Sequence, residues 1–203
     1  MNSDFLLTSL IVIATPGTGV LYTIARGLSH GVRIGVIAAL GCTLGIIPHM
    51  LAAVIGLAAV FNTSPMAFDF VKYAGVGFLI YMALRTLKES GPLQIDDISE
   101  ACSSLKIIVS AIVLNLLNPK LPIFFLAFLP QFVDMNDSHP TSHMLSLSAI
   151  FMLITFIVFA LYGTFAAFVR SHILSAPNIL QWMRITFASG FVGLAVKLAA
   201  SHR

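Results

Sequence analysis

Long apolar segments separated by short polar ones dominate the pattern of this chain. Six apolar segments run over about residues 5–25, 34–60, 68–87, 105–131, 146–169 and 180–200. Each is close to the roughly 20 residues that a helix needs to cross the hydrocarbon core of a bilayer. They lack the alternation that is typical of a transmembrane β-barrel. The pattern therefore predicts an all-α membrane protein, with six transmembrane helices in a single domain over 1–203.

Composition supports a membrane protein over a soluble one. Of the 203 residues, 58% are hydrophobic and 9% are charged, whereas a soluble domain carries about 25% charged residues. The net charge of +3 lies in polar segments between apolar ones, where the membrane explains it better than nucleic acid does. Cys42 and Cys102 form no CxxC pair, which argues against a disulfide framework and thiol chemistry. The N-terminal segment lacks a basic n-region and is expected to be the first crossing, not a cleaved signal.

The longest polar segment divides the chain into two halves of three helices. It is KESGPLQIDDISEACSS, residues 88–104, between a first repeat over about 1–87 and a second over about 105–203. Because three is odd, the second half enters the membrane from the opposite side, as in an inverted repeat. Helix one contains Pro16 and Gly17, and helix four contains Pro119 and Pro122, so both are expected to be broken. Interrupted helices at corresponding positions of two halves point to a transporter site.

Basic residues predict the orientation. With six crossings, the loops after helices one, three and five share one side, and that side holds most of the Lys and Arg: Arg26, Arg33, Arg85, Lys88, Lys106, Arg170 and Arg184. Cytoplasmic loops carry such an excess. The 88–104 loop is therefore predicted to be cytoplasmic, and both termini are predicted to lie on the outer, periplasmic face. The segment 132–145, which has no Lys or Arg, fits the outer side.

Five segments, in order along nearly the whole chain, resemble one known family. They are TPGTGVLYTIARGLSHGVRIGVIAALGCTLG, HMLAAVIGLAAV, KYAGVGFLIYMALRTLK, LLNPKLPIFFLAFLPQFV and GFVGLAVKLA. Together they are similar to the LysE/RhtB family of small amino-acid exporters, whose helix one carries Pro-Gly-Pro and whose helix four carries Asn-Pro-Lys. One residue departs from this pattern, because Thr18 stands where the family has its second proline.

The resemblance implies a secondary active exporter of amino acids or close derivatives in the inner membrane, driven by protons as an antiporter. No GxxxxGK[ST] motif is present, and the loops are too short for an ATPase domain. No cofactor is expected. An enzyme would need paired acids, a Ser/His pair or a metal cluster at membrane depth, and the sequence predicts no such group. The main alternative is a membrane scaffold or assembly protein that keeps the exporter fold without transport, and Thr18 is its main support.

Lys120 is the candidate for binding a zwitterionic substrate. A charge at the bilayer centre costs about 2.5–3.5 kcal/mol on insertion scales, so Lys120 must face the bundle interior or a wet cavity. Its ammonium either receives the substrate carboxylate or caps carbonyls freed by Pro119 and Pro122. A half-helix that starts at such a break presents free N–H groups and a positive dipole end. The candidate substrate-binding residues are Pro16, Gly17, Thr18, Asn118, Pro119 and Lys120, whereas Asn115 is expected to be structural.

His49 is the candidate proton carrier, because it lies within an apolar segment and titrates near neutral pH. Asp69 and Asp134, near the predicted outer ends, are the alternative carriers. The other interpretation of His49 is a neutral side chain that is hydrogen-bonded to a neighbouring helix. The motif Gly41-xxx-Gly45 is interpreted as packing inside the subunit, although a homodimer stays possible. No metal site is predicted.

Overall fold

A computed structural model describes residues 3–15, 17–61, 103–118, 120–133 and 139–168, with scattered positions between 73 and 84 and between 185 and 200. The regular elements in this part of the chain are all helical, as expected for an all-α membrane protein. Most of the predicted third and sixth helices and of the 88–104 loop lies outside the described residues, as do Pro16, Pro119, Asp69 and Asp134.

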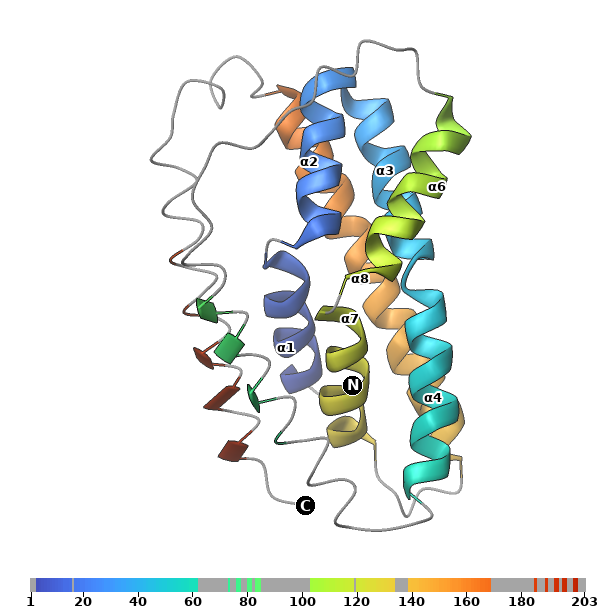
Figure 1. Cartoon of the computed structure of the whole chain (residues 1–203), viewed down its shortest axis with the longest axis vertical. Helices are drawn as coiled ribbons and strands as arrows, with labels where there is room; N and C mark the ends of the chain where they lie inside the picture. The colour runs from blue at the N-terminus through green and yellow to red at the C-terminus, as the bar shows by residue number, and fades with distance from the viewer. Residues whose placement is uncertain are drawn as a thin grey trace.

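The first helical pair is broken where the sequence predicts it. Helices α1 (Ser3–Ala14) and α2 (Thr18–His30) are bent by 59° at the break. A single residue, Gly31, then joins α2 to α3 (Val32–Leu44). Gly31 has φ 83°, a backbone conformation that glycine adopts without the Cβ penalty of other residues. This turn lays α3 alongside α2 (Figure 1).

The second broken pair begins at α6 (Ser104–Leu116), where the Ser103 side chain accepts a hydrogen bond from the Lys106 backbone N–H. Beyond the break, α7 (Lys120–Ile123) continues into a π-helical turn, η1 (Phe124–Phe128), and a 3₁₀ turn, η2 (Leu129–Phe132). The bend between the two parts is again 59°. Pro122 was expected to break the helix, but it lies in the first turn of α7, where a missing N–H costs nothing.

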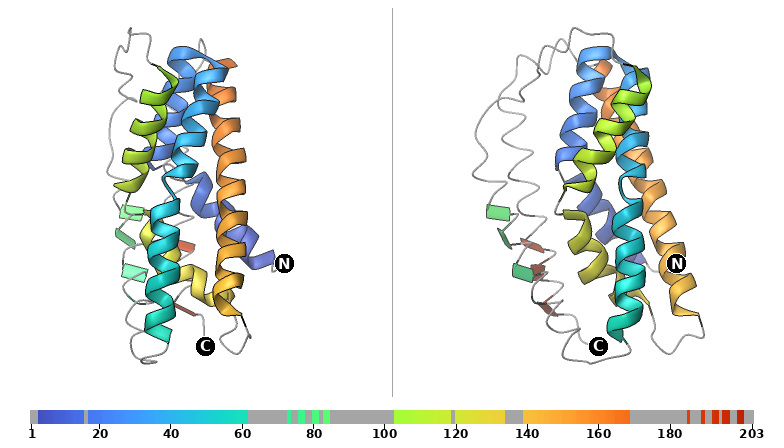
Figure 2. Two further views of the ribbon diagram at one scale, coloured as in Figure 1. Left: turned by 90° about the vertical axis from the view of Figure 1, so that its right-hand side faces the viewer. Right: turned by 45° about the vertical axis from the view of Figure 1, so that its right-hand side comes forward.

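The two broken pairs run in opposite directions. In Figure 1, α1 and α2 ascend from the lower end of the bundle, whereas α6 and α7 descend. The two breaks lie at a similar height, and the views in Figure 2 agree. Segments that are about one hundred residues apart in the sequence therefore meet in the middle of the bundle.

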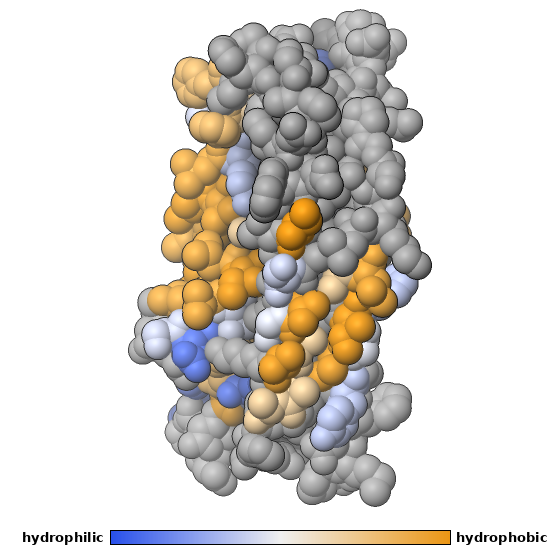
Figure 3. Space-filling view, turned by 90° about the vertical axis from the view of Figure 1, so that its left-hand side faces the viewer, coloured by the Kyte–Doolittle hydropathy of each residue, from blue (hydrophilic) through white to orange (hydrophobic). Residues whose placement is uncertain are grey.

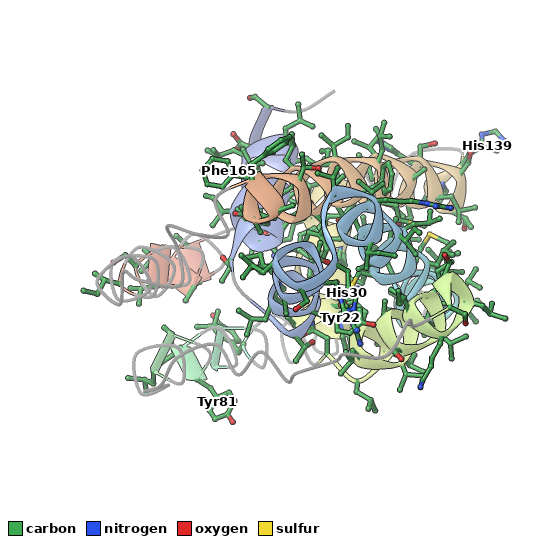
Figure 4. All side chains as sticks on the ribbon, turned by 90° about the horizontal axis from the view of Figure 1, so that it is seen from above. Tyr22, His30, Tyr81, His139 and Phe165 are labelled. Atoms are coloured by element: carbon green, nitrogen blue, oxygen red, sulfur yellow. The ribbon has the colours of Figure 1, made fainter. Side chains whose placement is uncertain are left out.

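Two continuous helical segments are long and apolar enough to cross a membrane. They are Val32–Gly56, which joins α3 to the first part of α4 (Ile47–Phe61), and α8 (Pro140–Phe168); each broken pair adds one more if it is counted as a single span. One stripe of α8 exposes large apolar side chains at Leu153, Ile157, Leu161, Phe165 and Phe168. Figure 4 places Phe165 on the outer side of α8, and Figure 3 shows a largely apolar described surface. Such a stripe suits contact with lipid, and the protein is membrane-embedded.

Close contacts between small residues hold the bundle together. A Cβ built on Gly27 of α2 would overlap the carbonyl oxygen of Gly163 on α8, and one on Gly163 would lie 2.9 Å from Cα of Gly35 on α3. Likewise, Gly41 and Gly45 face α6, where added Cβ atoms would lie 2.7 Å from the Ala111 Cβ and 2.9 Å from the Asn115 Cβ. The Gly41-xxx-Gly45 face therefore packs inside the chain, as the sequence indicates, and is not available as a dimer seam.

The Gly27 contact generates the first prediction. Gly27→Ala should destabilise the protein, because its methyl group must push α8 away from α2; overpacking of this kind costs about 1–3 kcal/mol. The measurement is the melting temperature in detergent. Gly56→Ala on α4 is the control, since nothing lies within 4 Å of the Cβ position there. Equal melting temperatures for the two variants would contradict the close contact.

Candidate functional site

The C-terminal end of α1 leaves backbone carbonyls without helical partners. The carbonyl of Val12 would normally accept from the N–H of residue 16, but that residue is proline and has no N–H. Lys120 fills the gap, because its Nζ donates to the carbonyl oxygens of Val12 and Thr15, at 3.0 Å each. Lys120 is only 6% exposed. A cation at the C-terminal end of a helix also complements the helix dipole.

This contact corrects one expectation. The capping interpretation of Lys120 assumed carbonyls freed by Pro119 and Pro122, in its own segment. The carbonyls that it reaches belong to α1 instead, in the other half of the chain. The ammonium therefore joins the two broken helices across the bundle. Since an ammonium has three N–H donors, two of these bonds leave one donor for another partner.

Tyr162 completes the end of α1. Its hydroxyl donates to the carbonyl of Ala14 at 3.1 Å. The Thr15 hydroxyl donates to the carbonyl of Ile11, within its own turn, at 2.6 Å. The carbonyls where α1 stops are thus bonded by side chains from α7 and α8 as well as by its own last residues.

The start of α2 is different, because its own N-cap residue cannot cap it with a side chain. Gly17 is its N-cap residue, in an extended conformation with φ −136°, and it has no side chain to donate or accept. The Thr18 hydroxyl points across to α6 and donates to the carbonyl of Leu114 at 3.3 Å. The N-terminal N–H groups of α2 and its positive dipole end therefore remain suited to an anion.

Two nitrogen donors face Gly17 from the second broken helix. A Cβ on Gly17 would lie 3.4 Å from Nδ2 of Asn118 and 3.4 Å from Nζ of Lys120. Asn118 is positioned by both ends of its amide: Oδ1 accepts from the Lys120 backbone N–H at 3.1 Å, and Nδ2 donates to Oδ1 of Asn115 at 3.3 Å. We call Gly17, Asn118 and Lys120 the Gly17 cradle. It places two side-chain donors of the second broken helix beside the start of α2, where Gly17 has no side chain to come between them.

Asn115 and His49 lie behind the cradle. Asn115 donates from Nδ2 to the carbonyl of Cys42 on α3, which fits the structural role expected for it. The Nε2 atom of His49, on α4, is 3.2 Å from the carbonyl oxygen of Asn115. A carbonyl only accepts, so Nε2 carries the hydrogen in this contact. His49 thus reaches the cradle through Asn115 and Asn118 and not directly.

The structure brings together four of the six residues that the sequence assigns to substrate. Gly17, Asn118 and Lys120 form the cradle, and Thr18 adjoins it; Pro16 and Pro119 lie outside the described residues. Within the described ranges, no group of three or more His, Cys, Asp or Glu side chains could hold a metal ion.

Two features escaped the sequence analysis. Tyr162 lies within α8, and a single tyrosine in an apolar helix does not indicate which group its hydroxyl bonds. Arg26 was assigned to a loop, but the structure places it inside α2, 8% exposed. Its spacing of four residues from Tyr22 and His30 is the signal that could have placed it on a helix face.

Comparison with known proteins shows the family of the chain. Residues 10–202 match the LysE type translocator family. An uncharacterized membrane protein of Vibrio cholerae is 32% identical over 97% of this chain and 95% of its own length. The homoserine/homoserine lactone efflux protein of Salmonella typhimurium is 27% identical over 98% and 95%, and the leucine efflux protein of an Enterobacter species is 28% identical over 98% and 94%.

No solved structure matches the chain. The family match nevertheless covers nearly all of the sequence, including both breaks and the cradle between them. The chain belongs to the LysE type translocator family.

Proposed function

We propose that this protein is a secondary active exporter of amino acids or close derivatives, and that the Gly17 cradle binds the substrate carboxylate. The observation that carries the proposal is the meeting of two nitrogen donors and an uncapped helix start at the breaks of two helices. Two of the relatives are named as efflux proteins, for homoserine or its lactone and for leucine. These compounds differ in their side chains, so the proposed substrate class is defined by the amino-acid group.

The chemistry of the cradle favours an anion. Lys120 has one N–H beyond its two carbonyl bonds, and Asn118 has one beyond its bond to Asn115. The start of α2 adds backbone N–H groups. Donors of this kind bind carboxylates through charge-assisted hydrogen bonds, which are about twice as strong as neutral ones. In this proposal Pro16 and Pro119 break the helices, and the Thr18 hydroxyl borders the bound carboxylate.

The six-helix inverted repeat is the proposed architecture, with repeats over about 1–87 and 105–203 around a cytoplasmic loop at 88–104. Two bent pairs of opposite direction and equal bend support it (Figure 1). Exchange between inward-open and outward-open states would then be a movement of one repeat against the other about the cradle.

The proposed location is the inner membrane, with both termini on the periplasmic face. Arg33 and Lys106 support this orientation, because they lie near the start of α3 and of α6, at the end of the bundle opposite the start of α1 (Figure 1). A reporter that is active only in the periplasm should work when it is fused to Arg203 and fail when inserted in the 88–104 loop. The reverse result, with matched expression of both fusions, would overturn the orientation.

The direct test of export uses purified protein in proteoliposomes loaded with radiolabelled homoserine or leucine. An outwardly directed substrate gradient should give efflux well above that of empty liposomes, and external substrate should exchange with it. The scaffold alternative is favoured by one observation, namely that the Lys120 ammonium already donates hydrogen bonds to two carbonyls at the end of α1. It predicts no efflux of either compound and no exchange.

A substitution at Gly17 tests the cradle better than one at Lys120. Removing the Lys120 ammonium leaves two buried carbonyls unpaired, at about 1–3 kcal/mol each, so lost transport would not separate binding from stability. Gly17→Ala instead places a methyl group 3.4 Å from both donor nitrogens, where a carboxylate oxygen must come closer, and it keeps every hydrogen bond of the fold. We expect efflux to fall about tenfold or more, the equivalent of one lost charge-assisted hydrogen bond.

Gly56→Ala is the matched control for this variant, because it adds the same methyl group to a position with no neighbour within 4 Å. Both variants should have the melting temperature of the wild type to within about 2 °C, a shift below that expected for 1 kcal/mol. Normal efflux per folded molecule in Gly17→Ala would remove the cradle from the substrate path.

Proton coupling through His49 is the proposed energy source. The hydrogen-bonded series from His49 through Asn115 and Asn118 to Lys120 supports it, since a charge on the imidazole acts on residues that position the cradle. His49→Gln retains a donor toward the Asn115 carbonyl but does not titrate. We expect this variant to keep substrate exchange at zero pH gradient and to lose the acceleration of efflux by an imposed gradient. An undiminished response to the gradient would exclude His49 as the carrier.

A further inference from the structure

Tyr22, Arg26 and His30 form a second polar group on one face of α2, away from the cradle. Their spacing of four residues places them one above the other. The Tyr22 hydroxyl donates to the carbonyl of Ile107 on α6 at 3.3 Å, and the guanidinium carbon of Arg26 is 4.9 Å from the centroid of the Tyr22 ring. Figure 4 shows Tyr22 and His30 together on the side of α2 that faces α6.

Arg26 is a buried cation whose hydrogen bonds are incomplete. It is 8% exposed, yet its Nη1 atom has no hydrogen-bond partner among the residues that the structure describes. The buried Nδ1 atom of His30 lacks a partner in the same way. Buried charges are normally paired, because leaving one without a partner costs several kcal/mol. The face of the Tyr22 ring supplies cation–π attraction to the guanidinium, while Nη1 has no oxygen or nitrogen acceptor among the described residues.

Among the helices that the structure describes, those that pack against α2 offer no acid to pair with this cation. The sequences of α2 itself and of α3, α6 and α8, which pack against it, contain no Asp or Glu. An unpaired ionisable group at membrane depth is first of all evidence for a functional site. A guanidinium has five donors in a planar fork that matches a carboxylate.

The position is separate from the cradle. Arg26 is eight positions after Thr18, which is about 12 Å along the axis of an α-helix. Arg26 therefore lies in a later part of α2 than the cradle, with its guanidinium over the Tyr22 ring. Arg26 lies on the half of the bundle that leads to Arg33 and Lys106, at the end proposed to be cytoplasmic.

We propose that Arg26, supported by Tyr22 and with His30 beside it, is a second binding position for the substrate carboxylate, occupied on the cytoplasmic side of the Gly17 cradle. The inference rests on the proposed export function. The substrate is drawn from the cytoplasm to the guanidinium and passes along α2 to Lys120. Arg26 therefore sets the affinity for substrate on the loading side, the cytoplasm. Lys120 binds the carboxylate afterwards, at the helix breaks.

The test compares Arg26→Gln with Arg33→Gln in proteoliposomes, with homoserine and leucine as the transported probes. Arg33 is exposed at the start of α3, so its variant removes the same charge from the same end of the bundle. We expect Arg26→Gln to raise KM on the loading side about tenfold or more, the equivalent of one charge-assisted hydrogen bond, and Arg33→Gln to change it less than twofold. Inhibition by leucinamide, which has no carboxylate, should be equal in all three proteins.

Melting temperature separates binding from folding. Arg26→Gln removes an unpaired buried charge, so its melting temperature in detergent should equal or exceed that of the wild type. Arg26→Lys, which keeps the charge without the fork, should have an intermediate KM. An unchanged KM in Arg26→Gln overturns the inference, and so does a lower melting temperature with a normal KM, which would make Arg26 a structural anchor. The proposed export function is tested separately by efflux through the wild-type protein. Export can be observed even if Arg26→Gln leaves KM unchanged.

Discussion

The ammonium of Lys120 on the carbonyls of α1 is the interaction on which the centre of this protein depends. In a membrane the backbone groups of a broken helix cannot rely on water, so each must find a partner inside the protein. Lys120 supplies two of those partners at once and comes from the other half of the chain. The burial of Lys120, the interruption of α1 and the meeting of the two broken pairs are therefore one arrangement. A cation is stabilised in the bilayer because carbonyls need it, and the helix can stop because the cation is there.

The two helix ends at the first break, the end of α1 and the start of α2, differ in their hydrogen-bond partners. This difference determines which groups the site offers. Lys120 and Tyr162 bond the carbonyl end of α1, whereas the N-cap residue of α2, Gly17, has no side chain that could cap the amide end. What remains open at the break is consequently a set of donors. Asn118 adds to this set, because its oxygen is occupied by the α7 backbone while its nitrogen faces Gly17. A break with the opposite arrangement, an open carbonyl end, would suit a cation such as an ammonium group.

The sequence predicted the all-helical, apolar character of the fold, and the resemblance to the LysE/RhtB family was confirmed by the match over residues 10–202. Apolar length and paired proline interruptions are local properties, so helices and breaks could be read directly. The partner of Lys120 could not be read from the sequence, because Val12 is 108 positions away and apolar, and only its backbone takes part.

Arg26 was assigned to a loop because a cation that follows an apolar segment is typical of a membrane boundary. Its burial against Tyr22 depends on the position of α6, which the sequence does not give. The helix-breaking effect of Pro122 was overestimated, since a proline in the first turn of a helix removes no helical hydrogen bond.

The dependence of α1 on Lys120 also has a consequence for how the chain is made. Synthesis proceeds from the N-terminus at about 5–20 residues per second, so the 108 positions between Val12 and Lys120 correspond to about 5–22 s. During that interval the carbonyls at the end of α1 lack the Lys120 ammonium that bonds them. Tyr162 is synthesised later still. The N-terminal half cannot complete its own helix end, whatever its apolar content, and an isolated N-terminal fragment would retain two carbonyls that lack the ammonium. The two broken pairs are thus not independent folding units, because a side chain of the second completes the end of α1.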